Sequence, residues 1–371
     1  MGNRLIKLKP DYYFYRKSII RWLFTIIDYF GFLFFNQKPL IKVSENKILL
    51  INLGGAGDLI ISEPLLSALS DFSGKKIDLV CCPNQEKALL NLPLIGKVFN
   101  CKLSWLGGGN GQRQLLINCF KLIKILRQEK YSVAIDIKGD PIIILLMFIS
   151  KIPLRVGFSN GGLGFLLTHP LSQPLNLKRF KVDLSLLDAF DVKNKEYNRE
   201  PYLPLFLARP QASGPIKNIA VHLGASVQAR QWPIEYWAKL FNLLKIKYQI
   251  AIIGAPEDFE KLFSLAPELI NSCDDCSGQS WSETAAAINR ADVFIGANSG
   301  PAHLAAAIGC RIISIFSAAN NPDVWAPPGA KVCIFKPDCY GCELKYCAPL
   351  SCLKAITPQI VYDYLSELDK A

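Results

Sequence analysis

Two patterns of apolar and polar residues alternate along most of this 371-residue chain. Nearly continuous apolar runs, such as residues 46–53 and 248–256, are typical of parallel strands that are buried on both faces. Longer segments with helical spacing, such as residues 114–130, lie between them. The repeated order of strand, helix and strand predicts an α/β protein with doubly wound parallel sheets.

The alternation occurs twice, which predicts two domains. In the first domain, strands are expected within residues 46–53, 75–82 and 131–139. In the second, they are expected within residues 217–225, 248–256, 291–303 and 310–316. A proline-rich stretch separates the two sets, so the predicted domains are 43–200 and 216–371, with a linker at 201–215. Because ligands of such sheets bind beyond the carboxyl ends of the strands, the functional loops are expected to face one another across a cleft.

Residues 1–42 have a different composition and are interpreted as a helical extension. Residues 1–18 carry five Lys or Arg and one Asp, and residues 19–35 are apolar and aromatic. Arg21 and Asp28 make the second stretch a poor candidate for a spanning helix, and their spacing puts them on one helical face. The segment therefore predicts an amphipathic helix on an anionic membrane surface, with a helix packed on the protein's own surface as the alternative.

Charge and cysteine content limit the partners. The formal net charge of +11 suggests an acidic partner, either a membrane or a phosphorylated substrate, and no nucleic-acid-binding motif is present. Twelve cysteines without a cleavable secretory signal favour the reducing cytoplasm. Cys339, Cys342, Cys347 and Cys352 could hold zinc, although their spacing is not a standard zinc pattern, and buried reduced thiols are the alternative. Residues 273–276 are expected in a polar loop.

Two motifs at strand ends have candidate chemistry. The sequence GGAGD at 54–58 lacks the Lys-Ser/Thr of a P-loop and the full dinucleotide fingerprint. Asp58 within it is either a helix N-cap or a general base. Ser226 and Arg230 follow the strand at 217–225 and suit a phosphate group, because a guanidinium is always charged and binds two oxygens at once. A surface arginine at a helix start is the alternative.

A third motif, ANSGPAH at 297–303, is typical of a helix start. Gly300 and Pro301 open the helix, and Ser299 stands at the N-cap position. The unpaired first amides and the helix dipole could receive a diphosphate. His303 lies in the first turn, where it either faces the same anion or is a structural histidine.

Together these blocks resemble the heptosyltransferase-like glycosyltransferases of family 9. LGGAGDLIISEPLLSAL, HLGASVQARQWPIEYWAKL and FIGANSGPAHLAAAIGCRIISIF occur in the family's order and spacing, and the cysteine-rich segment 339–365 follows them. YSVAIDIKGD and RVGF also fit, so the similarity covers roughly residues 45–366. It implies a GT-B architecture in which two Rossmann-like domains face a cleft. The acceptor would lie on the N-terminal domain and a nucleotide-sugar on the C-terminal one.

The resemblance also implies roles for residues. Asp58 would be the catalytic base, and Arg230, Ser226 and the amides around Gly300 would hold the diphosphate without a metal. Glu257 or Asp258 would accept hydrogen bonds from the ribose. The remaining implied residues are Asn298, Ser299, Pro301 and His303 on the donor side, and Gly54, Gly55, Gly57, Lys138 and Asp140 on the acceptor side.

Four positions depart from the family's pattern. Asn298 stands where the family often has Asp, Arg230 where Lys is common, Lys138 where Gln is frequent, and Phe180 where His is often seen. Donor binding therefore looks preserved, while the identity of the acceptor is open.

The function implied is that of an inverting glycosyltransferase, cytoplasmic and peripheral on the inner face of the cytoplasmic membrane. It would move a sugar, heptose from ADP-heptose, onto a lipopolysaccharide core or related lipid-linked glycan, with no cofactor besides the donor substrate. One alternative is a GT-B enzyme with another nucleotide-sugar donor. Another is a non-catalytic sugar-nucleotide-binding protein of the same fold, which Asn298 favours and Asp58 opposes.

Overall fold

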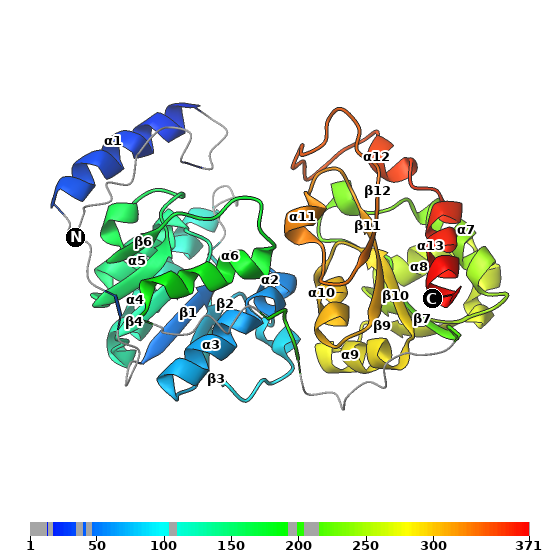
Figure 1. The fold of residues 1–371 in the computed structure, drawn as a ribbon, viewed down its shortest axis with the longest axis horizontal. Helices are drawn as coiled ribbons and strands as arrows, with labels where there is room; N and C mark the ends of the chain where they lie inside the picture. Colours follow the sequence, from blue (N-terminus) through cyan, green and yellow to red (C-terminus); the bar gives the residue numbers. More distant parts are fainter. Residues whose placement is uncertain are drawn as a thin grey trace.

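The computed structural model describes residues 13, 18–34, 40–41, 47–103, 110–191, 199–203 and 215–370. Two α/β lobes lie side by side, each built around a six-stranded parallel sheet (Figure 1). Helices cover both faces of each sheet, so the predicted doubly wound fold with two domains is confirmed. The predicted linker falls largely on residues 204–214, which lie outside the described residues.

The first sheet has the strand order β3-β2-β1-β4-β5-β6. Its strands are β1 (Ile48–Asn52), β2 (Ile77–Cys81), β3 (Ile95–Asn100), β4 (Val133–Asp136), β5 (Leu154–Phe158) and β6 (His169–Leu171). Its helices are α2 (Ala56–Ile61), α3 (Glu63–Ser73), η2 (Glu86–Leu89), α4 (Asn110–Glu129), α5 (Pro141–Ile149), η3 (Gly164–Leu166), α6 (Arg179–Leu184) and η4 (Ser185–Ala189). Strands β1, β2 and β4 are buried throughout, as their apolar runs predict.

The second sheet has the order β12-β11-β10-β7-β8-β9. Its strands are β7 (Asn218–His222), β8 (Gln249–Gly254), β9 (Cys273–Ser277), β10 (Val293–Ala297), β11 (Arg311–Phe316) and β12 (Lys331–Ile334). Its helices are η5 (Gln228–Arg230), α7 (Ile234–Leu244), α8 (Pro256–Leu265), η6 (Pro267–Ser272), α9 (Trp281–Arg290), α10 (Gly300–Ala307), α11 (Pro322–Trp325), α12 (Ser351–Lys354) and α13 (Pro358–Lys370).

The predicted strands are found where the apolar runs place them, but residues 273–276 were wrongly expected in a loop. They belong to β9, an edge strand that pairs with β8. Asp274 and Asp275 are exposed there, whereas Cys276 is buried. An edge strand in contact with water can carry charged residues, so its composition resembles that of a loop.

Helix α1 (Ser18–Phe34) lies on the outer side of the first lobe (Figure 1). Asp28 is fully buried beneath it and accepts a hydrogen bond of 2.8 Å from the hydroxyl of Tyr13. A side chain at Gly31 would collide with the ring of Phe165, so this face fits closely against the lobe. The opposite face exposes large apolar residues: Ile19, Trp22, Leu23, Ile26, Tyr29, Phe30, Leu33 and Phe34. Among the described helices, none combines the length and apolar character that a membrane span requires.

One of the three buried hydrophobic clusters in the described part of the chain spans both lobes, and each lobe also has a cluster of its own. A single cluster of buried side chains runs from Ile48 and Leu59 in the first lobe to Phe294 and Ala302 in the second.

The segment between the lobes is also anchored. The guanidinium of Arg199 donates to both carboxylate oxygens of the buried Glu63, at 2.6 and 2.8 Å.

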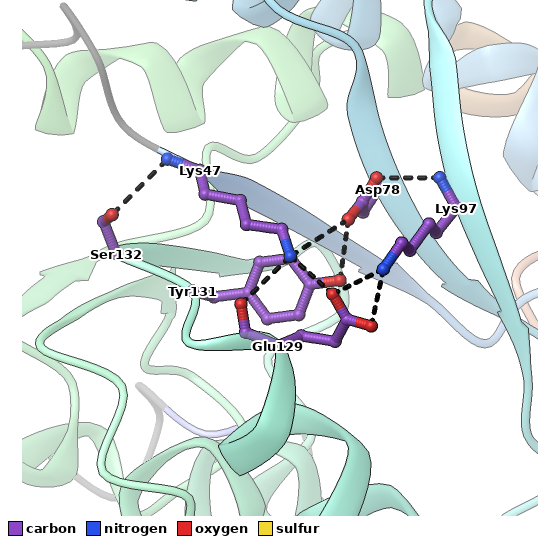
Figure 2. Close-up of polar contacts among 6 residues, drawn as sticks. All are labelled: Lys47, Asp78, Lys97, Glu129, Tyr131 and Ser132. Atoms are coloured by element: carbon purple, nitrogen blue, oxygen red, sulfur yellow. Dashed lines mark hydrogen bonds and ion pairs between the residues drawn. The ribbon is translucent and has the colours of Figure 1, made fainter.

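A polar network holds the amino ends of the strands in the first sheet (Figure 2). The hydroxyl of buried Tyr131 donates to Asp78 Oδ2 at 2.8 Å, and the backbone amide of Lys97 donates to Asp78 Oδ1 at 2.7 Å. The ammonium groups of Lys47 and Lys97 both bind the Glu129 carboxylate, at 2.5 and 2.7 Å. The network therefore ties α4 to the strands next to it.

Replacing Tyr131 with Phe is expected to destabilise the fold without affecting a function at the opposite sheet edge. The change removes the hydrogen bond to Oδ2 of buried Asp78 and leaves that oxygen with the longer ion pair to Lys47, at 3.9 Å. We expect the free energy of unfolding to fall by about 1.5–3 kcal/mol, the range for a hydrogen bond to a charged group. Denaturant unfolding measures this change. The matched control is Tyr346→Phe, whose side chain is 69% exposed and should change stability little. Equal stability of both variants would contradict the role given to the network.

Candidate active site

A cavity of about 540 Å³ lies between the lobes, where carboxyl ends of strands from both sheets face each other. Four of the predicted residues line it from the first lobe: Gly55, Gly57, Asp58 and Lys138. Eight line it from the second lobe: Ser226, Arg230, Asp258, Asn298, Ser299, Gly300, Pro301 and His303. The strand-end loops therefore meet at one site.

Three predicted residues do not line this cavity. Gly54 acts indirectly, because a Cβ there would lie 2.4 Å from Asp58 Oδ2, so only glycine leaves room for the carboxylate. Asp140 is the N-cap of α5 and accepts a 2.8 Å hydrogen bond from the amide of Ile142. Glu257 is exposed in the first turn of α8, and its neighbour Asp258 faces the cavity instead. Phe180 is buried and also lies away from the cavity lining.

Asp58 lies in the first turn of α2 with both carboxylate oxygens engaged. Oδ2 accepts a 2.8 Å hydrogen bond from the amide of Gly55, and Oδ1 forms a 2.6 Å ion pair with Lys138 Nζ. The expectation that Asp58 is the N-cap was wrong, because Gly55 holds that position and Asp58 stands at the third residue of the helix. From there its carboxylate binds the Gly55 amide and also faces the cavity. Burial alone would raise the pKa of Asp58, but the charge and hydrogen bond of Lys138 and the Gly55 amide outweigh it and lower that pKa. The carboxylate is therefore ionised at neutral pH.

Arg230 comes from η5, whose backbone is fixed by the cysteine-rich segment. The side-chain amide of Gln228 exchanges hydrogen bonds with the backbone of Cys347, at 2.9 and 3.3 Å, and the Ala229 amide donates to Lys345. The Arg230 guanidinium is half-buried, and within the described residues its Nε has no hydrogen-bond partner. Burial lowers the Arg230 pKa, whereas nearby Asp58 raises it.

The cysteines of this segment do not form a metal site in the described part of the chain. No group of three or more His, Cys, Asp or Glu residues there is placed to hold a metal ion. The observed contacts of residues 339–352 with η5 are instead made by backbone groups.

Helix α10 begins at Gly300. The side chain of its N-cap residue, Ser299, makes no capping hydrogen bond to the helix. The Ser299 hydroxyl donates to the carbonyl of Ala297 at 3.2 Å and lies 3.1 Å from Nδ1 of His222. Burial lowers the pKa of His222 to about 4, which keeps the ring neutral.

His303, one turn into α10, is also buried and neutral. Burial lowers its pKa to about 4, against the opposite influence of Asp58. Among the described residues, Nδ1 of His303 has no hydrogen-bond partner. The cavity edge thus contains two buried side-chain donors or acceptors, at Arg230 and His303, that a ligand could satisfy.

The sequence alone missed several cavity residues. Those with polar or aromatic side chains are His222, Trp281, Trp325, Gln85 and Asn320. His222 lies inside the predicted segment 217–225 and is the last residue of β7. Its place next to the predicted motif with Ser226 and Arg230 could have identified it. Trp325 lies in α11, outside every predicted motif. Its ring faces two cations of the other lobe. Lys138 Nζ lies 6.0 Å from the ring centroid, and the guanidinium carbon of Arg179 lies 5.9 Å from it.

Two doubly wound lobes with an ionised carboxylate on one side of the cavity and an arginine and a helix start on the other define a GT-B-type transferase. The family model of glycosyltransferase family 9 (heptosyltransferase) matches residues 119–348. The chain belongs to this family.

Known relatives are similar at low identity over most of the chain. Lipopolysaccharide heptosyltransferase 3 of Escherichia coli K12 is 22% identical over 300 residues, covering 73% of this chain and 82% of that protein. Lipopolysaccharide heptosyltransferase 1 of Campylobacter coli is 24% identical over 299 residues, covering 73% and 84%.

Solved structures share the fold. The E. coli ADP-heptose lipopolysaccharide heptosyltransferase II superposes with a TM-score of 0.68 at 19% identity, covering 88% of this chain and all (100%) of that one. E. coli heptosyltransferase WaaC with ADP-2-deoxy-2-fluoro heptose gives a TM-score of 0.66 at 16% identity, covering 86% and 99%.

Proposed function

We propose that this protein is an inverting glycosyltransferase that moves heptose from ADP-heptose onto a lipopolysaccharide core or a related lipid-linked glycan. The observation that carries the proposal is the ionised Asp58, which shares one cavity with Arg230 and the start of α10. The related lipopolysaccharide heptosyltransferases, and the WaaC structure with an ADP-heptose analogue, support the choice of donor and acceptor.

In the proposed reaction, the acceptor hydroxyl oxygen attacks the anomeric carbon and its proton passes to Asp58. The bond between the anomeric carbon and the diphosphate oxygen breaks, and the diphosphate leaves with the electron pair. Attack from the side opposite to the leaving group inverts the configuration. Ser226, the amides near Gly300 and the Arg230 guanidinium stabilise the charge that develops on the leaving group.

The positive charge of Arg230 is fixed by the protein itself, so we propose that the transfer requires no divalent metal. Asp258 is assigned to the ribose hydroxyls, because it faces the cavity while Glu257 does not. Asn298 is buried at the cavity wall and carries no charge. This neutral amide favours one alternative, a non-catalytic sugar-nucleotide-binding protein, which the ionised Asp58 opposes. The other alternative is a different nucleotide-sugar donor, so the donor test includes ADP-heptose and nucleotide-activated hexoses.

We further propose that the protein works at the inner face of the cytoplasmic membrane, where a lipid-linked acceptor is held. The exposed aromatic and aliphatic face of α1 supports this, since such a face binds the interface of a bilayer. The basic residues expected to accompany it lie mostly in residues 1–17, of which only Tyr13 is described. They would add electrostatic attraction to anionic lipids.

Asp58→Asn is expected to cut turnover by on the order of 10²–10⁴, because the amide cannot take the acceptor proton. ADP affinity should remain nearly unchanged. Donor-dependent release of ADP in the presence of lipopolysaccharide core acceptor measures the first effect. Asp71→Asn is the matched control, since this carboxylate is exposed on α3. Near-normal turnover of the Asp58 variant would remove the residue from the base role.

Arg230→Ala should weaken ADP binding by about 1.5–3 kcal/mol, the range for hydrogen bonds to charged groups. The loss follows from the removal of a half-buried cation at the proposed diphosphate site. Isothermal calorimetry measures it. The control is Arg290→Ala, an exposed arginine at the end of α9 in the same lobe. If both variants bind ADP as the wild type does, Arg230 lies outside the donor site.

Phe30→Glu is expected to weaken sedimentation with anionic liposomes by at least about tenfold, because burying a phenylalanine contributes about 1.5–3 kcal/mol. The remaining binding should fall further in high salt, which screens the basic residues. Ile246→Glu is the matched control, since Ile246 is 83% exposed on the other lobe. A wild-type protein that does not sediment, or a Phe30 variant that sediments equally well, would contradict the membrane proposal.

A further inference from the structure

Lys138 is held rigidly in the loop that follows β4. The backbone amides of Lys138 and Asp140 donate to the two carboxyl oxygens of fully buried Asp136, at 3.1 and 2.8 Å. Gly139 between them has a φ of +67°, and a Cβ there would lie 2.6 Å from the Phe158 carbonyl oxygen. The loop therefore presents the Lys138 side chain in a fixed direction.

That direction leads to Asp58. Strands β4 and β1 are hydrogen-bonded neighbours in the sheet, so the loops at their carboxyl ends lie side by side. Lys138 Nζ reaches Asp58 Oδ1 at 2.6 Å, with the side chains 29% and 23% exposed. Trp325 of the second lobe faces the same ammonium group at 6.0 Å. Lys138 is thus held between its carboxylate partner and an aromatic ring from across the cavity.

The second nearby cation does not compete for Asp58. Arg179 pairs with buried Asp183 at 2.9 Å and donates to the carbonyl of Ile137 at 2.8 Å. Within the described residues, the ion pair of Lys138 is with Asp58. The charged and titratable groups that influence Asp58 or are influenced by it are Lys138, Arg179, Asp183, Arg230 and His303.

A carboxylate that acts as a base must be ionised and must aim an oxygen at the hydroxyl that it deprotonates. The Gly55 amide fixes Oδ2, and Lys138 fixes Oδ1, so together they set the plane of the carboxylate. Lys138 also opposes the burial that would otherwise favour the protonated form.

We propose that Lys138 is a positioning residue that keeps the Asp58 carboxylate charged and aligned in the ligand-free enzyme. The inference rests on the proposed role of Asp58 as the base. During transfer the acceptor proton passes to Asp58, and Lys138 keeps all its protons. A neutral glutamine at this position could donate one hydrogen bond but would supply no charge.

The first test is the pH dependence of kcat/KM, which reports ionisations of the free enzyme. The assay is ADP release from ADP-heptose with lipopolysaccharide core as the acceptor. In Lys138→Gln, the acid limb of the profile should move to higher pH, because Asp58 loses the neighbouring positive charge that favours its ionised form. The ratio of kcat/KM at pH 5 to kcat/KM at pH 8 should therefore fall by about tenfold relative to the wild type. Lys138→Arg should restore the wild-type limb. Lys124→Gln, an exposed lysine on α4, serves as the control.

The second test does not depend on activity. Asp58→Asn, Lys138→Gln and the double variant form a thermodynamic cycle in denaturant unfolding. Because the pKa of Asp58 is lowered in the folded protein, the coupling between the two side chains should be present at pH 7. It should be lost as the pH falls through that lowered pKa, where Asp58 becomes protonated.

The outcomes separate the two proposals. A wild-type protein that releases no ADP contradicts the proposed function. An active Lys138→Gln protein with an unmoved acid limb overturns the role of Lys138 while leaving Asp58 as the base. Absence of coupling at pH 7 overturns it as well, since the ion pair would then contribute nothing in solution.

Discussion

The site depends on the close approach of two glycines, Gly57 at the start of α2 and Gly300 at the start of α10. A Cβ on Gly57 would lie 3.2 Å from the Cα of Gly300 and from the ring of His303. A Cβ on Gly300 would lie 3.1 Å from Trp281. A side chain on Gly57 would therefore crowd the start of α10, and one on Gly300 would crowd Trp281 of its own lobe and lie 3.4 Å from the Gly57 amide nitrogen. Either change would disturb the arrangement of Asp58 and the proposed diphosphate site. The lobes can meet this closely only because both residues lack side chains.

Two of the cations near this contact are paired with carboxylates. Lys138 is paired with Asp58 and Arg179 with Asp183. Arg230 forms no ion pair in the described part of the chain. The Arg230 guanidinium, on the lobe opposite Asp58, can therefore attract an anion without displacing these two pairs. A diphosphate and a proton-accepting carboxylate can therefore occupy the same cavity despite their like charges.

The fold was predictable because buried parallel strands leave continuous apolar runs, and the rule that ligands bind at their carboxyl ends brought distant motifs to one edge. The finer assignments depend on side-chain direction, which the sequence does not show. Glu257 and Asp258 are neighbours on α8, yet one faces water and the other the cavity. The partnership of Lys138 and Asp58 joins residues 80 positions apart. The spacing of Arg21 and Asp28 did not show that Asp28 is buried against the lobe, where the hydroxyl of Tyr13 donates a hydrogen bond to it.

The two edges of the sheets differ in how completely their polar groups are satisfied. At the amino edge of the first sheet, Asp78 and Glu129 each bind protein donors, and the network depends on no ligand (Figure 2). At the carboxyl edge of the second sheet, Arg230 Nε and His303 Nδ1 are buried without partners among the described residues. Buried polar atoms left in this state cost free energy, commonly about 1–3 kcal/mol each. A ligand that satisfies them recovers that cost on binding, so the same atoms that weaken the empty protein strengthen its affinity for an anionic donor.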